Sequence, residues 1–192
     1  MTHKIREVYI VHHSHTDVGY TDLQEQVIYN QANNIRRAVE LIENGIKNNT
    51  TQKDLKWNCE TWYCVEQFFK MATEEEKEKF FDLVKKGNIG LPANYLNFND
   101  LADCKYLKEK IHTMQEICGE KGIQIKTAMI ADINGISMGQ RDALIENGVE
   151  FLYTNIHTHH GMYPLYQNQK PYFWENENGQ RLLVWNGEHY NL

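Results

Sequence analysis

The stretch Val8-Tyr9-Ile10-Val11 leads directly into His12-His13-Ser14-His15-Thr16-Asp17-Val18-Gly19-Tyr20, and this junction bears on both fold and function. Its first four residues are apolar and β-branched or aromatic, which predicts a buried β-strand. Alternate residues of an extended chain share one face, so we expect His13, His15 and Asp17 to project together beyond the strand's carboxyl end. Side chains of these types can bind one divalent metal ion. The alternative interpretation is a solvated loop that happens to be rich in histidine.

Length and charge limit the classes of protein to consider. The 192 residues suit one domain, which at this size buries about two thirds of its unfolded surface. The formal net charge is −6, and the basic residues are interleaved with acids, so we expect no nucleic-acid partner. Charged residues precede any apolar run, and no segment approaches the length of a membrane span. We therefore expect no membrane partner and a cytoplasmic location.

The four cysteines do not indicate a metal knuckle or a disulfide framework. Cys59, Cys64, Cys104 and Cys118 lack the paired C-x-x-C spacing of a zinc knuckle and the density of a secreted scaffold. We expect reduced and mostly buried thiols.

Hydrophobic periodicity predicts alternating helices and strands. Helices are expected over residues 22–47, 65–71, 74–86, 101–118 and 138–146. Strands are expected over residues 8–11, 55–60, 89–95, 127–131, 151–156 and 181–185. Thr73-Glu74-Glu75-Glu76 is a capping box that opens the third helix. The alternation implies an α/β fold with mostly parallel strands and crossover helices, because parallel neighbours need long return connections.

Polar residues follow the predicted strands, at the edge where parallel α/β folds collect their ligands. They are His13, His15, Asp17, Glu60, Asn94, Tyr95, Asp132, Asn134, His157, His159 and His160. Three protein ligands with one open position are typical of a catalytic zinc site, and Asp132 can add the third ligand to His15 and Asp17. From their place on this rim, Glu60, Trp62 and Asn94 are our candidates for substrate binding.

Each candidate also has a purely structural interpretation. Asp132 can accept backbone N–H groups in a turn, and Glu60 can serve a helix N-terminus. Trp62 can be a packing residue rather than a platform for a sugar, and Asn94 a hydrogen-bonding loop residue.

Two motifs carry a family resemblance. His13-Ser14-His15-Thr16-Asp17-Val18-Gly19-Tyr20 matches His-x-His-x-Asp-x-Gly-aromatic, and Asp132-Ile133-Asn134-Gly135-Ile136-Ser137 matches Asp-x-x-Gly-x-Ser. On these residues the chain resembles the N-terminal catalytic domain of the glycoside hydrolase family 38 α-mannosidases. Glu60-Thr61-Trp62 and Phe173-Trp174-Glu175 extend the resemblance over nearly the whole chain.

The resemblance implies a fold, a metal and a reaction. The fold would be an incomplete seven-stranded (β/α) barrel, with residues 1–192 forming one domain at the N-terminal part of a longer glycoside hydrolase. The metal would be zinc, held by His15, Asp17 and Asp132. Asp132 would also be the nucleophile that forms a glycosyl-enzyme intermediate in a retaining reaction on an oligosaccharide or glycoside. No other cofactor is implied.

The chain departs from the family pattern at several positions. Thr16, Val18 and the pair Ile133-Asn134 replace the usual residues, so the sugar recognised can differ from mannose. The family's general acid and second histidine ligand come from sequence beyond this chain. On position alone Glu60 is a candidate acid, and one of three histidines is a candidate fourth ligand: His157, His159 or His160.

Two other functions stay open. One is a metal-dependent polysaccharide deacetylase, in which zinc-bound water attacks an amide carbonyl. The other is a carbohydrate-binding fragment without activity. An open barrel edge would also allow a homo-oligomer.

Overall fold

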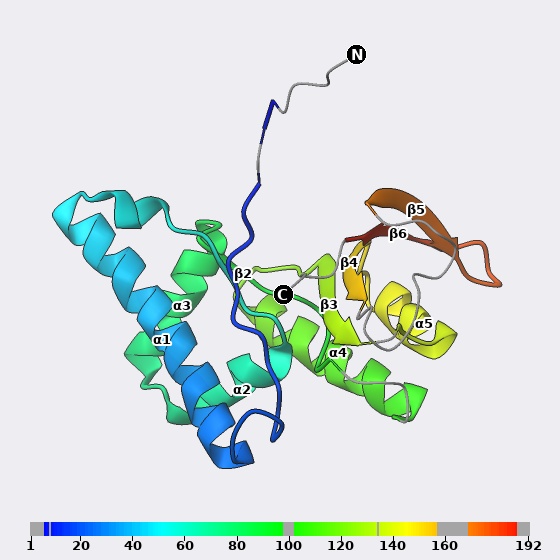
Figure 1. Ribbon diagram of the computed structural model, residues 1–192, viewed down its shortest axis with the longest axis horizontal. Coiled ribbons are helices and arrows are strands. Elements are labelled where there is room, and N and C mark those ends of the chain that lie inside the picture. Colours follow the sequence, from blue (N-terminus) through cyan, green and yellow to red (C-terminus); the bar gives the residue numbers. More distant parts are fainter. Residues whose placement is uncertain (1–5, 8, 98–101, 134, 157–168, 188–192) are drawn as a thin grey trace.

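The computed structural model describes residues 6–7, 9–97, 102–133, 135–156 and 169–187 (Figure 1). The helices are α1 (Gln24–Asn48), the 3₁₀ helix η1 (Thr51–Asp54), α2 (Trp62–Met71), α3 (Glu74–Lys85), α4 (Cys104–Glu120) and α5 (Met138–Glu146). The strands are β1 (Trp57–Asn58), β2 (Ile89–Gly90), β3 (Thr127–Ile133), β4 (Phe151–Ile156), β5 (Lys170–Glu175) and β6 (Arg181–Asn186). All five α-helices predicted from the sequence are present.

Local sequence features explain where α3 begins and which faces of the helices are buried. The capping box at the start of α3 is confirmed: the Thr73 hydroxyl oxygen accepts from the Glu76 amide, and the Glu76 carboxylate accepts from the Thr73 amide. In α1 most of the apolar stripe is buried, with Ile35 and Ile42 almost fully excluded from solvent, whereas Leu41 and Ile46 are exposed. Phenylalanines of α2 and α3 pack edge to face or tilted, which joins these two helices to one core.

The described strands form two sheets rather than one closed barrel. β1 pairs with β2 in parallel. The second sheet has the order β3-β4-β6-β5, in which β3, β4 and β6 are parallel and β5 is antiparallel. The expected α/β fold with mostly parallel strands is therefore observed, whereas a seven-stranded barrel is not confirmed, since the described residues contain six strands in two sheets.

The two sheets meet through a short extended segment after β2. The Ala93 amide donates to the Thr127 carbonyl over 2.8 Å, and the Asn94 and Asn97 side chains accept from amides of β3. Side-chain amides take the place of a backbone ladder here, so β2 and β3 are neighbours without being paired strands.

The prediction of a strand over residues 8–11 is wrong for its described part. Residues 9–12 have no strand assignment, and Tyr9 and Ile10 are 84% and 69% exposed. The segment extends away from the rest of the molecule (Figure 1) and makes one parallel bridge, between His13 and Asn58. A strand needs a ladder of hydrogen bonds as well as favourable side chains, and β1 offers only two residues.

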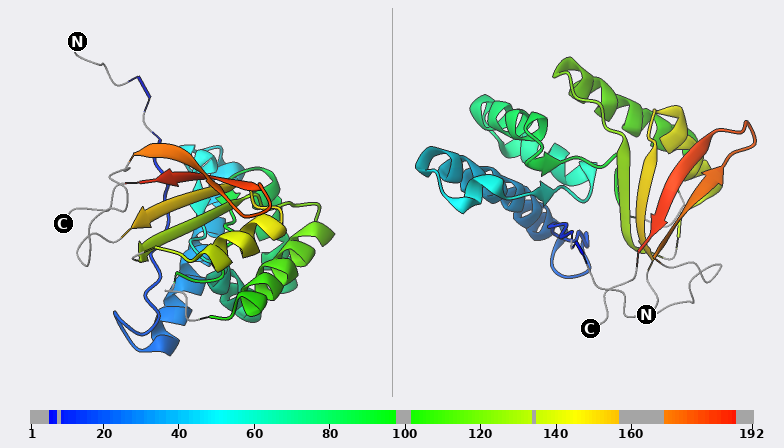
Figure 2. Two further views of the ribbon diagram at one scale, coloured as in Figure 1. Left: turned by 90° about the vertical axis from the view of Figure 1, so that its right-hand side faces the viewer. Right: turned by 90° about the horizontal axis from the view of Figure 1, so that it is seen from above.

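The four-stranded sheet has one covered and one open face. Figure 2 shows α4 and α5 on the covered face, where Ile130, Leu152 and Val184 are buried. The open face carries partly exposed aromatic side chains, including Tyr153 and Trp185.

The four cysteines lie within the described residues. Cys59, Cys64 and Cys118 are buried, Cys104 is partly exposed, and all four thiols are free, as predicted. Among the helices that the structure describes, none combines the length and the apolar character needed to cross a membrane.

Candidate metal and active site

His15, Asp17 and Asp132 converge, although Asp132 is separated from the other two by more than a hundred residues. His15 Nε2 lies 3.4 Å from Asp17 Oδ1 and 3.3 Å from Asp132 Oδ2. One ligand atom from each residue lies within 4.8 Å of the other two. The side chains are 25%, 30% and 18% exposed, so the cluster can be reached from solvent. One imidazole nitrogen and two carboxylate oxygens are donors that zinc uses in proteins, so the residues present fit a divalent ion.

Asp132 reaches this cluster through a distortion of β3. The register with β4 shifts between Ala131 and Ile133, so Asp132 is the extra residue of a β-bulge. Its φ of +60° lies in the left-handed region, which Asp tolerates better than most residues. Bulges redirect a side chain away from the regular alternation, which explains how Asp132 leaves the strand pattern to face His15.

The segment that carries His15 and Asp17 is held mainly by side chains of other elements. Gln31 of α1 donates to the His15 carbonyl over 2.6 Å, and Asn34 of α1 donates to the Ser14 hydroxyl over 3.0 Å. The Asn58 amide of β1 donates to the His12 carbonyl over 2.8 Å. Gln31 and Asn34 were not predicted as site residues, because polar positions on a helix give no sequence signal for a contact of this kind.

Glu60 lies beneath the cluster. Its side chain is fully buried, and its two oxygens accept from His15 Nδ1 and from the Thr16 amide, both over 2.7 Å. The hydrogen bond to Glu60 is the largest influence that raises the pKa of His15 to about 9. Burial acts in the opposite direction, and the nearby charges of Glu60, Asp17 and Asp132 add to the rise.

The residues expected to contact substrate are all buried. Asn94 is 1% exposed, and its amide group bonds the Glu60 carbonyl and the Met129 amide. Trp62 is also 1% exposed and packs edge to face on Phe69. Their burial leaves little surface for a direct contact with a sugar, and substrate binding by Glu60, Trp62 and Asn94 stays a prediction.

Glu60 is also a poor match for the general acid considered from its position. Both of its oxygens are occupied by N–H donors, and the side chain is shielded from solvent. The remaining sequence candidates, Asn134, His157, His159 and His160, lie outside the described residues.

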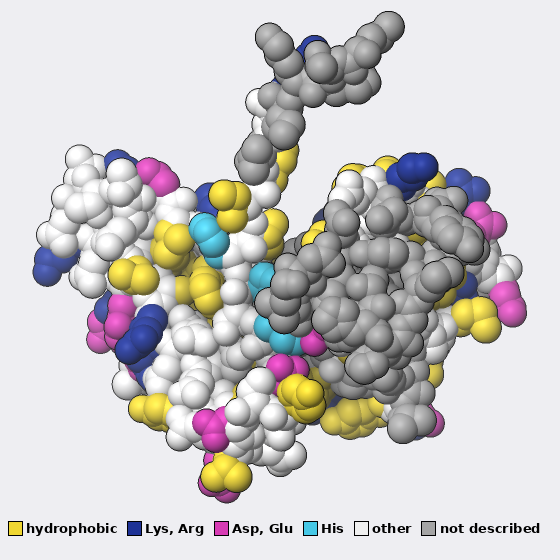
Figure 3. Space-filling model, in the orientation of Figure 1, with side chains coloured by type: hydrophobic (Ala, Val, Ile, Leu, Met, Phe, Trp, Pro, Cys, Tyr) yellow, Lys and Arg dark blue, Asp and Glu magenta, His cyan; other side chains and the backbone are white. Residues whose placement is uncertain are grey.

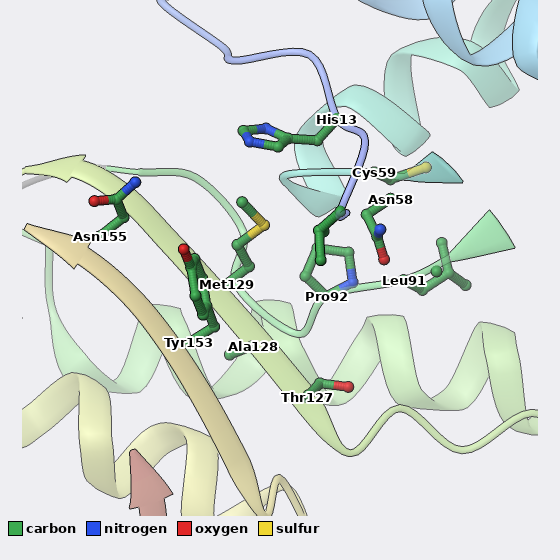
Figure 4. Close-up of a pocket in the computed structure, with 12 residues that line it drawn as sticks. His13, Asn58, Cys59, Leu91, Pro92, Thr127, Ala128, Met129, Tyr153 and Asn155 are labelled. Carbon is green, nitrogen blue, oxygen red and sulfur yellow. The ribbon is translucent and has the colours of Figure 1, made fainter. Parts of the chain in front are cut away.

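A cavity of about 300 Å³ is lined by His13, but not by His15, Asp17 or Asp132 (Figure 4). One wall comes from the residues around β1 and β2, such as Asn58 and Leu91, and the other from β3 and β4, such as Met129 and Tyr153. Burial lowers the pKa of His13, whose Nδ1 lies 3.6 Å from Glu60 and has no hydrogen bond. Figure 3 shows histidine and acidic side chains gathered where the helical half meets the half containing the larger sheet.

A sequence comparison identifies a family. The family described as "Glycosyl hydrolases family 38 N-terminal domain" matches residues 6–192. No curated protein sequence matches the chain.

Solved structures share the fold at low sequence identity. An α-mannosidase from Enterococcus faecalis V583 has a TM-score of 0.68 and 14% identity, over 92% of this chain and 19% of its own. A glycosyl hydrolase family 38 protein from Enterococcus faecalis has a TM-score of 0.65 and 12% identity, over 92% and 18%. A 4-α-glucanotransferase from Thermococcus litoralis has a TM-score of 0.59 and 14% identity, over 84% and 25%. The chain thus spans a quarter or less of each of these three structures.

Proposed function

Because the chain belongs to glycosyl hydrolase family 38, we propose that it forms the N-terminal part of a metal-dependent, retaining glycosidase that cleaves α-mannosidic bonds through an intermediate on Asp132. The observation that carries this proposal is the convergence of His15, Asp17 and Asp132. The sequence separates their two motifs widely, and a shared site for one ligand would account for their meeting. An α-mannosidase among the solved structures of similar fold agrees with the choice of bond.

The metal would be held by His15 Nε2 and by one oxygen each from Asp17 and Asp132. When bound, a divalent ion such as zinc supplies positive charge that attracts and orients sugar hydroxyl oxygens. The chain itself would contribute a partly exposed rim, open enough to admit a sugar, and a buried layer beneath it that fixes the three side chains.

Asp132 is the nucleophile of this proposal. Its carboxylate is 18% exposed and lies beside His15, with Oδ2 3.3 Å from Nε2. In the proposed reaction one Asp132 oxygen bonds to the anomeric carbon while the bond from that carbon to the leaving oxygen breaks, and a separate acid protonates the leaving oxygen. Water then cleaves the glycosyl ester and regenerates Asp132, with retention at the anomeric carbon. The described residues supply the nucleophile, and we assign no residue to the acid.

The test is Asp132→Asn, assayed on an aryl α-mannoside. Loss of the attacking carboxylate should lower turnover by about 10³-fold or more. The matched control is Asp82→Asn, the same chemical change at an exposed position of α3, which should leave turnover unchanged. Unchanged turnover in Asp132→Asn would exclude Asp132 as the nucleophile.

Two companion measurements examine the rest of the proposal. Mass spectrometry after reaction with a slowly hydrolysed fluorinated α-mannosyl donor should find the sugar on the peptide that contains Asp132. Elemental analysis should find a divalent metal that Asp17→Ala loses.

Acetate release from acetylated oligosaccharides without glycosidic cleavage would instead indicate a deacetylase. Saturable mannoside binding without turnover at any metal loading would indicate a binding module.

A further inference from the structure

The deepest charged group of the site is Glu60, a fully buried carboxylate for which the proposed reaction has no use. We propose that Glu60 is a positioning residue: it keeps the proton of His15 on Nδ1, leaves Nε2 free to bind the metal, and with Asn94 sets the spacing between the two ligand-bearing segments. This inference rests on the proposed function, because it concerns the metal site of that reaction.

The first step concerns the proton on His15. An ionised carboxylate can only accept hydrogen bonds, so the 2.7 Å contact requires that Nδ1 of His15 is the donor. In the neutral ring the second nitrogen then has a free lone pair. That nitrogen, Nε2, is the atom that faces Asp17 and Asp132. Histidines that bind metals commonly use this arrangement, in which a carboxylate on one nitrogen orients the other.

The second step concerns the backbone between the two N-terminal ligands. The other oxygen of Glu60 accepts from the amide of Thr16, the residue between His15 and Asp17. The Thr16 side chain is buried as well, with its hydroxyl 3.2 Å from the Cys64 sulfur. One buried carboxylate thus fixes both the ring of His15 and the turn of chain that aims Asp17.

The third step connects Glu60 to the strand that carries the third ligand. Asn94 donates to the Glu60 carbonyl over 3.1 Å and accepts from the Met129 amide of β3 over 3.0 Å. The backbone carbonyl of Asn94 accepts from the Trp62 amide over 2.9 Å. Together with the hydrogen bonds of Ala93 and Asn97 to β3, this buried amide sets the distance between the segment of Glu60 and the strand of Asp132.

Glu60 acts on His15 rather than on His13. The same carboxylate oxygen lies 2.7 Å from Nδ1 of His15 but 3.6 Å from Nδ1 of His13. The longer distance exceeds that of a hydrogen bond, so of these two histidines Glu60 orients only the ring of His15.

Glu60→Gln is the decisive variant, because glutamine has nearly the same shape but only one acceptor oxygen. The Thr16 amide can only donate, so the glutamine oxygen must face it and the NH₂ group must face His15. Nδ1 of His15 then has to accept, which moves the proton to Nε2 and blocks the metal-binding nitrogen. We expect zinc affinity, measured by competition with a chromophoric chelator, to fall about 10- to 100-fold.

The tautomer is measured directly by long-range ¹H–¹⁵N correlation on metal-free protein at about pH 10, where His15 is largely neutral. Wild type should show the proton on Nδ1, and Glu60→Gln should show it on Nε2. A wild-type His15 that carries its proton on Nε2 would overturn the proposal without reference to any variant, so it stays testable even if Glu60→Gln fails to fold.

Two further variants complete the design. Glu66→Gln, the same change at a partly exposed carboxylate of α2 that bonds Tyr95, is the matched control and should keep wild-type zinc affinity and tautomer. Asn94→Asp keeps the acceptor for Met129 but loses the donor to the Glu60 carbonyl, so it should weaken zinc binding and leave the His15 tautomer unchanged. Equal zinc affinity in wild type and Glu60→Gln would contradict the proposal, as would equal affinity in Asn94→Asp for the spacing role.

The outcomes separate this inference from the proposed function. Hydrolysis that depends on Asp132 but survives unchanged in Glu60→Gln, with an unchanged tautomer, would refute the positioning role alone. In the opposite case, wild type shows the Nδ1 tautomer, Glu60→Gln binds zinc more weakly, and wild type hydrolyses no substrate. That result would support the positioning role and refute the glycosidase.

Discussion

Residues 9–11 and β3 both bring apolar side chains up to the candidate site, but the fold treats them differently. In β3, Ile130 is 2% exposed and the strand pairs with β4 along its length. In the N-terminal segment, Ile10 is 69% exposed and pairing is limited to the single bridge of His13. Side chains with high β-propensity occur in both, so propensity alone does not decide which run becomes a strand.

The difference extends to the ligands that follow each run. Asp132 is aimed by a feature of the backbone, the bulge in a paired strand. His15 and Asp17 follow an unpaired run and are held by side chains from other elements, chiefly Glu60 and Gln31. The two halves of one site should therefore fail in different ways when they are perturbed.

The largest expected effect is on the packing of the two apolar runs. Ile130→Ala should lower the free energy of unfolding by about 2–5 kcal/mol, because it removes buried methyl groups and leaves a cavity. Ile10→Ala, the same change in the exposed run, should alter it by less than about 0.5 kcal/mol. Urea unfolding measures both values. A similar loss in the two variants would mean that residues 9–11 are packed as a strand in solution.

The next largest effect is the change in the free energy of unfolding as pH rises and His15 loses its proton. Its pKa of about 9 in the folded protein lies above the unfolded value of 6.5, so protonation favours folding. This stabilisation is complete below pH 6.5, declines as pH rises toward 9 and is lost above it, and its upper limit is about 3 kcal/mol. Unfolding of metal-free wild type should therefore become easier relative to His15→Gln over this range. A difference between the two proteins that does not vary with pH would contradict the pKa shift of His15.

The smallest effect is expected at α1. Gln31→Ala removes the donor to the His15 carbonyl and should cost about 1 kcal/mol of stability, because that carbonyl then loses its partner in a partly buried place. Gln26→Ala, at an exposed position of the same helix, should cost only a few tenths of a kcal/mol. Thermal unfolding of the two variants gives the comparison. Equal losses would show that α1 does not hold the His15 segment through Gln31.

Much of the helical structure could be predicted because its determinants are local. The Thr73 capping box and the apolar stripe of α1 need only neighbouring residues. The capping box has the expected form, and the stripe is buried except at positions such as Leu41 and Ile46. β4 has the bounds that its apolar run predicted. The strands predicted over residues 55–60 and 89–95 contract to β1 and β2, two residues each. The residues around them make only isolated backbone hydrogen bonds, such as that of the Ala93 amide to the Thr127 carbonyl.

The convergence of His15, Asp17 and Asp132 could be predicted as well, but the way these side chains are held could not. His15, Asp17 and Asp132 occur in motifs whose residue types already suggest metal binding. The supporting roles of Glu60, Asn94 and Gln31 could not be predicted, because the sequence does not distinguish a buried carboxylate or amide from an exposed one. Their partners lie 16 to 45 residues away in the sequence, and only folding brings them together.

The sequence by itself determined the alternation of helices and strands, the helix start at Thr73 and the residues able to bind a metal, since each depends on local spacing and on chemistry that a side chain carries with it. The tertiary structure alone decided that residues 9–11 stay unpaired, that a bulge turns Asp132 toward His15, and that Glu60 lies buried beneath both. The physical reason is that pairing, burial and tautomer choice are properties of contacts between distant segments, and such contacts exist only after the chain has folded.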